Sequence, residues 1–171
     1  TPATGPGPAE ASQLLAAKCA ERGIQLSFDG NYRELLWKSW DGNGPAILKN
    51  ILSHATIAFI NERDVALLLG TEPETRKDAI TRAFDAFPNL KIIAATQRAQ
   101  SSVSNQSLIG EYYTRDAFFA SRAHELEGVV DRIGGGDAFA AGVLHCLLND
   151  AEPQYTIEFA MAAGAIKHSI P

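Results

Sequence analysis

Cysteine is scarce in this chain, with only Cys19 and Cys146 among 171 residues. The two lie far apart in segments of helical composition and lack zinc-site spacing, so we expect reduced packing residues of a cytoplasmic protein rather than a catalytic thiol. No apolar run approaches the roughly 20 residues that a membrane-spanning helix needs. Basic residues are not in excess either, since the net charge is −5. We therefore expect a soluble protein without a membrane span or a basic surface for nucleic acid.

Two common nucleotide-binding motifs are also missing, the pattern G-x-x-x-x-G-K-[ST] and the pattern G-x-G-x-x-G. What is present is the run D-R-I-G-G-G-D at residues 131–137, directly after Val129-Val130. We predict that the valines end a strand, that the glycines form a turn, and that a helix follows. Such a turn lets backbone N–H groups approach an anion, and the helix N-terminus adds partial positive charge. A purely structural role is the alternative, since Gly tolerates positive φ and Asp caps helices.

This run resembles the second signature of the PfkB (ribokinase-like) carbohydrate kinases, D-T-x-G-A-G-D. The chain has Arg132 where Thr is common and Gly135 where Ala is common. The form D-R-I-G-G-G-D-A-F is typical of the 2-keto-3-deoxygluconate kinase branch. Residues 27–33 with Leu36-Trp37 are similar to that branch's D-x-N-Y-R-x-x-L-W segment. The order and spacing of the two motifs agree with the family, and the resemblance covers nearly the whole chain.

The resemblance implies an α/β fold, a ribokinase-like three-layer α/β/α sandwich with a mostly parallel central sheet. Strands that alternate with helices favour the same class, with an antiparallel portion late in the chain. We interpret residues 1–171 as a single partial domain, the nucleotide-binding C-terminal portion. The chain has no initiating Met, and residues 1–8 read as loop. Relative to the family, about the first half, with its lid and most sugar contacts, is missing, so we expect a fragment.

The apolar pattern predicts the positions of the main elements. Helices are expected at 9–22, 46–54, 65–69, 74–87, 136–149 and 152–168, strands at 24–28, 56–60 and 90–95, and β-structure at 107–114 and 117–130. In parallel sheets, ligands bind beyond the carboxyl ends of the strands. The predicted strand ends place Asn31, Arg33, Asn61, Thr96 and residues 134–137 there.

For the glycine run, the resemblance implies that Asp137 is the general base. It would take the proton from an acceptor hydroxyl as that oxygen attacks the γ-phosphate of ATP. The backbone N–H groups of Gly134, Gly135 and Gly136 would form the anion hole for the transferred group. A helix-capping carboxylate is the alternative role for Asp137.

Arg33 is the residue that we expect to select the substrate. A planar guanidinium can bind the carboxylate of a sugar acid through two hydrogen bonds. In the family this Asn-x-Arg segment lies between sugar and nucleotide, so Asn31 and Arg33 are also candidates for contact with phosphate. The structural alternatives are a turn residue at 31 and a surface arginine paired with Glu34 or Asp29.

Asn61 and Asp64 stand where the family shows N-x-x-E, which organises Mg²⁺ and phosphate through waters. Asp64 is one methylene shorter than the usual Glu, and an N-cap for the following helix is the alternative role for Asn61. Thr96 matches a position near the nucleotide. Arg98 and Arg132 would lie close to the phosphates, either assisting transfer or pairing with Asp131.

Together these residues predict a kinase that uses ATP and Mg²⁺ to phosphorylate the 6-hydroxyl of 2-keto-3-deoxygluconate, a step of Entner–Doudoroff sugar-acid breakdown. The expected partners are the sugar acid and ATP, and neither nucleic acid nor a membrane. Two alternatives stay open: another sugar kinase of the family, such as a fructokinase or ribokinase, and a nucleotide-binding module without catalysis. The sequence leaves the exact sugar and the oligomeric state undetermined.

Overall fold

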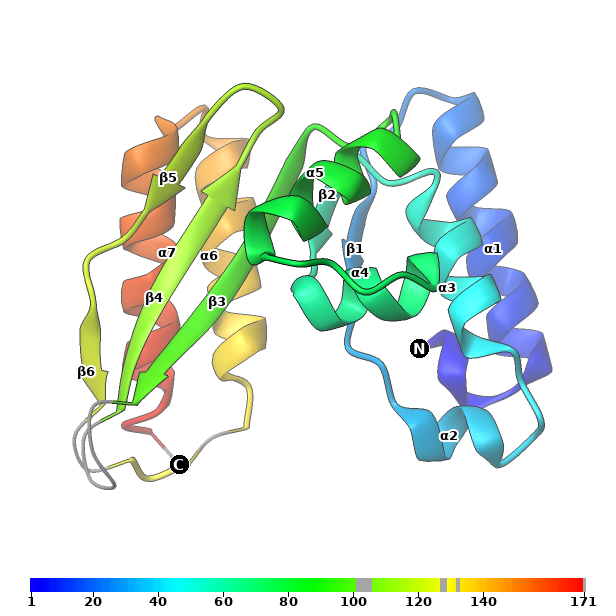
Figure 1. Ribbon diagram of the computed structural model, residues 1–171, viewed down its shortest axis with the longest axis horizontal. Helices are drawn as coiled ribbons and strands as arrows, with labels where there is room; N and C mark the ends of the chain where they lie inside the picture. The colour runs from blue at the N-terminus through cyan, green and yellow to red at the C-terminus, as the bar shows by residue number, and fades with distance from the viewer. Residues whose placement is uncertain (101–105, 127–128, 132, 171) are drawn as a thin grey trace. The chain divides into compact units, whose positions relative to one another are not determined.

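The computed structural model describes residues 1–100, 106–126, 129–131 and 133–170. It separates into two compact units, Thr1–Ile93 and Ala94–Pro171 (Figure 1). The first unit contains the short 3₁₀ helix η1 (Pro2–Thr4), α1 (Pro6–Glu21), β1 (Ser27–Asp29), α2 (Glu34–Lys38), α3 (Gly44–Leu52), β2 (Ile57–Phe59), α4 (Glu62–Leu69) and α5 (Arg76–Ala86). Strand β3 (Ile92–Gln100) begins in this unit and continues into the second.

In the first unit, β1 and β2 are parallel neighbours, with Phe28 opposite Ala58. Helices α2 and α3 lie between them in the sequence, as a parallel pair requires a crossover connection. The core is apolar, and Leu52, Ala58 and Leu90 are fully buried. Because the strands run in the same direction, the residues that follow them emerge at one edge of the sheet.

The second unit is a helical pair packed on antiparallel strands. It contains β4 (Gln106–Tyr113), β5 (Phe118–Ala120), β6 (His124–Leu126), α6 (Gly135–Leu148) and α7 (Pro153–Lys167). Strand β4 pairs with β5 and with β6, both antiparallel. Helix α7 packs against α6 and against all three of these strands. The helices approach closely at Gly142, where an added Cβ would lie 2.7 Å from the Cα of Ala160.

The strand order is β1-β2-β3-β4-β5, with β6 beside β4. The late antiparallel portion is therefore confirmed. The helices predicted at 136–149 and 152–168 correspond to α6 and α7, within one or two residues at each end. Helix α2 was not predicted, and α1 begins at Pro6, inside the segment expected to be loop.

The prediction that a strand ends at Val129-Val130 is wrong, because neither valine belongs to a strand. Two β-branched residues favour a strand only where a neighbouring strand receives their hydrogen bonds. Here the N–H of Val130 donates instead to the carbonyl of His168, at 2.9 Å. Both cysteines are free thiols, as expected. None of the helices in the described ranges is long and apolar enough to cross a membrane.

Candidate functional site

The glycine turn of the second unit begins with a local hydrogen bond and a left-handed residue. The N–H of Ile133 donates to Asp131 Oδ1 at 2.9 Å. Gly134 then takes φ +79° at the N-cap position of α6. Side chains strongly disfavour this conformation, so glycine is required at 134 for the chain to enter the helix at this angle.

Helix α6 presents its first turn to solvent. Gly136 and Asp137 are exposed, whereas Gly135 is buried. The first hydrogen bond of the helix runs from the N–H of Ala138 to the carbonyl of Gly134, at 2.8 Å. The N–H groups before Ala138 have no partner inside the helix, and they lie at its electropositive end. This arrangement can bind an anion.

The carboxylate of Asp137 lies in that first turn. It forms no ion pair with any side chain in the described part of the chain. An exposed carboxylate next to an anion-binding helix end can accept a proton from a hydroxyl held there. Arg132 lies outside the described residues, so its part in this arrangement stays a prediction.

The sequence pattern predicts that Thr96 lies beyond the end of a strand. This prediction is wrong, because Thr96 lies within β3. Burial ends at Ala95, which is why the apolar pattern indicated a strand end there, but strand backbone continues to Gln100. The side chains of Thr96 and Arg98 are both exposed.

In the first unit, the segment after β1 holds Asn31 and Arg33 in a defined local geometry. The N–H of Asn31 donates to Asp29 Oδ1 at 3.1 Å, and Arg33 Nε donates to Asn31 Oδ1 at 2.9 Å. Glu34 pairs with Lys38 at 2.7 Å, so it does not pair with Arg33 as the structural alternative supposed. The guanidinium is exposed, and its two terminal nitrogens extend beyond the Asn31 contact.

Asn61 and Asp64 form a reciprocal cap at the start of α4. Asn61 Oδ1 accepts from the N–H groups of Arg63 and Asp64, at 2.8 and 3.2 Å. Asp64 Oδ2 accepts from the N–H of Asn61 at 2.9 Å. The capping alternative is therefore present in the structure and accounts for both side chains locally.

The capping carboxylate of Asp64 also lies against the segment that follows β1. A Cβ added to Gly30 would be 2.9 Å from Asp64 Cγ, so this glycine lets the two segments approach. Burial raises the pKa of the Asp64 carboxyl, and the negative charges of Asp29 and Glu62 raise it further. The predicted residues of the first unit are thus brought together at the carboxyl ends of β1 and β2.

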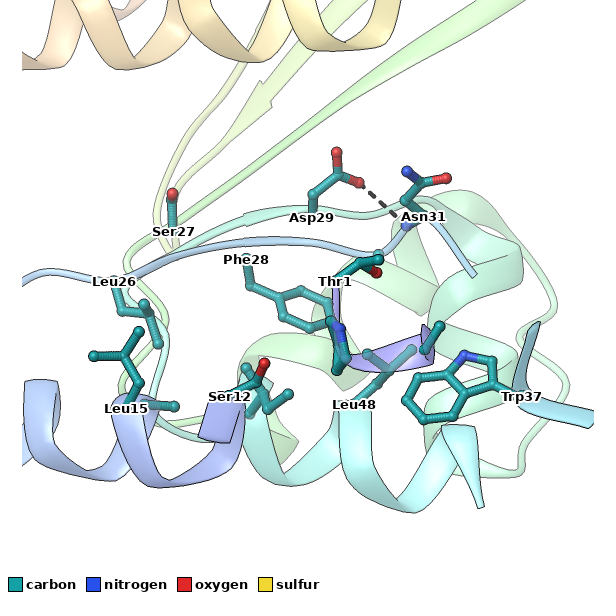
Figure 2. A pocket seen from close by; sticks show the side chains of 15 residues that line it. Thr1, Ser12, Leu15, Leu26, Ser27, Phe28, Asp29, Asn31, Trp37 and Leu48 are labelled. Atoms are coloured by element: carbon teal, nitrogen blue, oxygen red, sulfur yellow. Dashed lines mark hydrogen bonds between the residues drawn. The ribbon is translucent and has the colours of Figure 1, made fainter. Parts of the chain in front are cut away.

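A cavity of about 340 Å³ lies on the other side of β1. Figure 2 shows Phe28 pointing into it from the strand, with Leu48 and Trp37 along its wall. Asp29 points the opposite way in the same view, as alternation along a strand requires. The cavity reaches the candidate site only at the end of β1, where Asp29 and Asn31 are among its lining residues.

Comparison with known proteins identifies the chain. A model of the pfkB family carbohydrate kinases matches residues 6–169. The chain belongs to this family. Probable fructokinase-6, chloroplastic, of Arabidopsis thaliana is 34% identical over 168 residues, which are 93% of this chain and 40% of that protein.

Two solved structures confirm the ribokinase-like α/β fold. A PfkB family carbohydrate kinase from Listeria grayi superposes with a TM-score of 0.84 at 31% identity, covering 95% of this chain and 50% of that one. A 2-dehydro-3-deoxygluconokinase from Thermotoga maritima gives 0.84 at 26% identity, covering 100% and 52%. The chain thus spans about half the length of the family members it matches.

The donor groups of this PfkB chain fit magnesium in an outer-shell role. The described residues contain no group of three or more His, Cys, Asp or Glu that could hold a metal ion. Mg²⁺ usually keeps several waters and binds through substrate phosphates with few protein ligands. Asp64, whose pKa is raised partly by neighbouring negative charge, is a carboxylate that a hydrated cation would stabilise.

Sequence reasoning missed His168, which is buried directly beneath the glycine turn. Its carbonyl oxygen accepts the hydrogen bond from the N–H of Val130. A signal was available at position 135, where this chain has glycine and the related motif commonly has alanine. The absence of a side chain there indicates that something occupies the space that a methyl group would need.

Proposed function

We propose that the protein containing this chain is an ATP-dependent sugar kinase. The N–H groups of Gly134, Gly135 and Gly136 stabilise the oxygens of the transferred phosphoryl group. Asp137 takes the proton of the attacking hydroxyl. As the new O–P bond forms, the bond between the γ-phosphorus and the bridging oxygen breaks, and ADP leaves with that oxygen.

One observation carries this proposal: an exposed aspartate stands in the first turn of a helix that begins at a left-handed glycine. Anion binding alone would need only the glycines and the helix end. Asp137 places a negative charge beside the anion, which opposes anion binding and so supports a catalytic use of this carboxylate over binding alone. The alternative of a non-catalytic module is therefore disfavoured.

The first unit contributes most of the groups that we assign to the substrates, and the second unit adds Thr96. Asn31 and Arg33 contact the sugar or the phosphates, and Asn61 and Thr96 help to bind the nucleotide. Asp64 would hold a Mg²⁺ ion through the waters of that ion, which would supply positive charge to offset the phosphates. We place the reaction in the cytoplasm, where two free cysteines remain reduced.

We infer that the preferred acceptor is the 6-hydroxyl of 2-keto-3-deoxygluconate. The support is Arg33, whose Nε is fixed by Asn31 while its terminal nitrogens remain available for a carboxylate. A neutral sugar offers no such group. The likeness to the Thermotoga maritima kinase agrees with this inference, whereas the Arabidopsis thaliana relative favours fructose as the alternative acceptor.

The test compares acceptors on the complete gene product that contains this chain. ADP formation is measured with 2-keto-3-deoxygluconate, fructose and ribose, in the wild type and in Arg33→Ala. We expect the sugar acid to be preferred, and the variant to raise its KM about 10- to 100-fold, as loss of a charged hydrogen-bonded pair does. Preference for fructose with an unchanged KM in the variant would keep the kinase and overturn the choice of substrate.

A further inference from the structure

The imidazole of His168 is held in one position at the C-terminal end of α7. The residue is 5% exposed, and its Nδ1 lies 2.7 Å from the carbonyl oxygen of Gly164. A carbonyl only accepts, so Nδ1 carries the proton and donates it. This hydrogen bond to the preceding helical turn fixes the plane of the ring.

The ring fills the space that a side chain at Gly135 would occupy. A Cβ built on Gly135 would overlap His168 Cε1 and lie 3.1 Å from both ring nitrogens. At Gly136, one residue along the same helix, an added Cβ meets nothing within 4 Å. The glycine requirement at 135 therefore comes from the ring beneath it, whereas position 136 is open.

The backbone of His168 holds the start of the same turn. Its carbonyl accepts from the N–H of Val130 at 2.9 Å and from the N–H of Asp131 at 3.4 Å. The neighbouring Lys167 places Nζ 3.7 Å from Asp131 Oδ2. Since Asp131 Oδ1 accepts from the N–H of Ile133, the last turn of α7 supports the glycine segment at both of its ends.

The other ring nitrogen supplies no hydrogen bond that would explain the residue. Nε2 is buried and has no partner within the described part of the chain. A buried nitrogen left without a partner costs stability. The ring is therefore accounted for by its anchored Nδ1 and by its contact with Gly135, the first residue of α6.

We propose that His168 is a positioning residue for phosphoryl transfer, holding Gly135 so that the first N–H groups of α6 meet the transferred phosphate. This inference rests on the proposed kinase function. It makes positions 135 and 168 a coupled pair. Alanine at 135 displaces the turn as long as the histidine is present, and a smaller residue at 168 relieves the displacement.

The experiment is a double-mutant cycle in the complete gene product, with Gly135→Ala, His168→Asn and the double variant. Asparagine can still donate to Gly164 but lacks Cε1, the atom that would overlap a Cβ at Gly135. We expect Gly135→Ala to lower kcat about 10- to 100-fold, as displacements near 1 Å do in active sites, with little change in the sugar KM. The double variant should recover kcat about tenfold over Gly135→Ala.

Folding is followed in the same samples by the midpoint of thermal unfolding. Gly136→Ala is the matched control for stability, because its methyl group enters open space and should not lower the midpoint. If Gly135→Ala does not fold, recovery of folding in the double variant establishes the contact. The kcat of His168→Asn, expected to be several-fold below the wild type at equal folded fraction, then decides the positioning role.

Two results would overturn the inference alone. One is a wild type that phosphorylates sugar while the two substitutions act multiplicatively on kcat. The other is a loss of stability in Gly135→Ala with an unchanged kcat in the folded fraction, which would make His168 a packing residue only. A wild type that transfers no phosphate to any sugar would instead refute the proposed function, and this inference with it.

Discussion

The cap of α4 can be removed by one substitution whose cost follows from the structure. Asn61→Ala deletes an oxygen that accepts two hydrogen bonds, at 2.8 and 3.2 Å, at the start of a helix of eight residues. Loss of such an N-cap costs about 1–2 kcal/mol of unfolding free energy. We expect the complete gene product to lose this amount in urea unfolding at pH 7.

Asn50→Ala provides the matched control for this prediction. Asn50 is exposed within α3 and is not a helix cap, so its replacement should leave stability within about 0.5 kcal/mol of the wild type. If Asn61→Ala behaved like this control, the cap would not be what maintains the start of α4. The polar pair at 61 and 64 would then need another explanation, with ligand binding first among them.

Two further predictions concern a charge and a close contact. The pKa of the Asp64 carboxyl in the fold is raised above its ordinary 3.8. Ionisation of this carboxyl therefore destabilises the fold as the pH rises from about 4 through the raised pKa. Relative to the wild type, Asp64→Asn should therefore gain stability as the pH rises above about 4, and a difference in the free energy of urea unfolding that does not change with pH would contradict this sign. Gly142→Ala should lower the unfolding free energy by about 1–3 kcal/mol, because its methyl group meets the backbone of Ala160. An unchanged unfolding midpoint would show that α6 and α7 can separate at no cost.

The class of fold could be predicted from the sequence because its signals are local. Apolar spacing located α6 and α7, and the alternation of strands with helices indicated the α/β class. The end of β3 was misplaced because burial and backbone pairing end at different residues, Ala95 and Gln100. The pattern of apolar residues indicates which positions are buried, but it does not indicate where the strand backbone ends.

The candidate site was predictable only where a motif covers it. Gly134 and Asp137 followed from the glycine run, and the structure gives the run a left-handed turn and an exposed helix end. The contact of His168 with Gly135 joins two residues that are 33 positions apart in the sequence, and no local sequence pattern predicts such a contact. The sequence also cannot distinguish the two roles of Asn61, helix cap and ligand-binding residue, because the distinction depends on which groups its side chain contacts in the folded protein.

The kinase assignment is decided by measuring transfer of the γ-phosphate of ATP to 2-keto-3-deoxygluconate by the wild type and by Asp137→Asn. ATP binding is measured in the same samples by calorimetry. We expect turnover in the wild type, a loss of about 10²- to 10⁴-fold in the variant, and ATP affinity in the variant within a few fold of the wild type. Undiminished transfer by Asp137→Asn would contradict the assignment of the base, and ATP binding without transfer in the wild type would contradict the kinase.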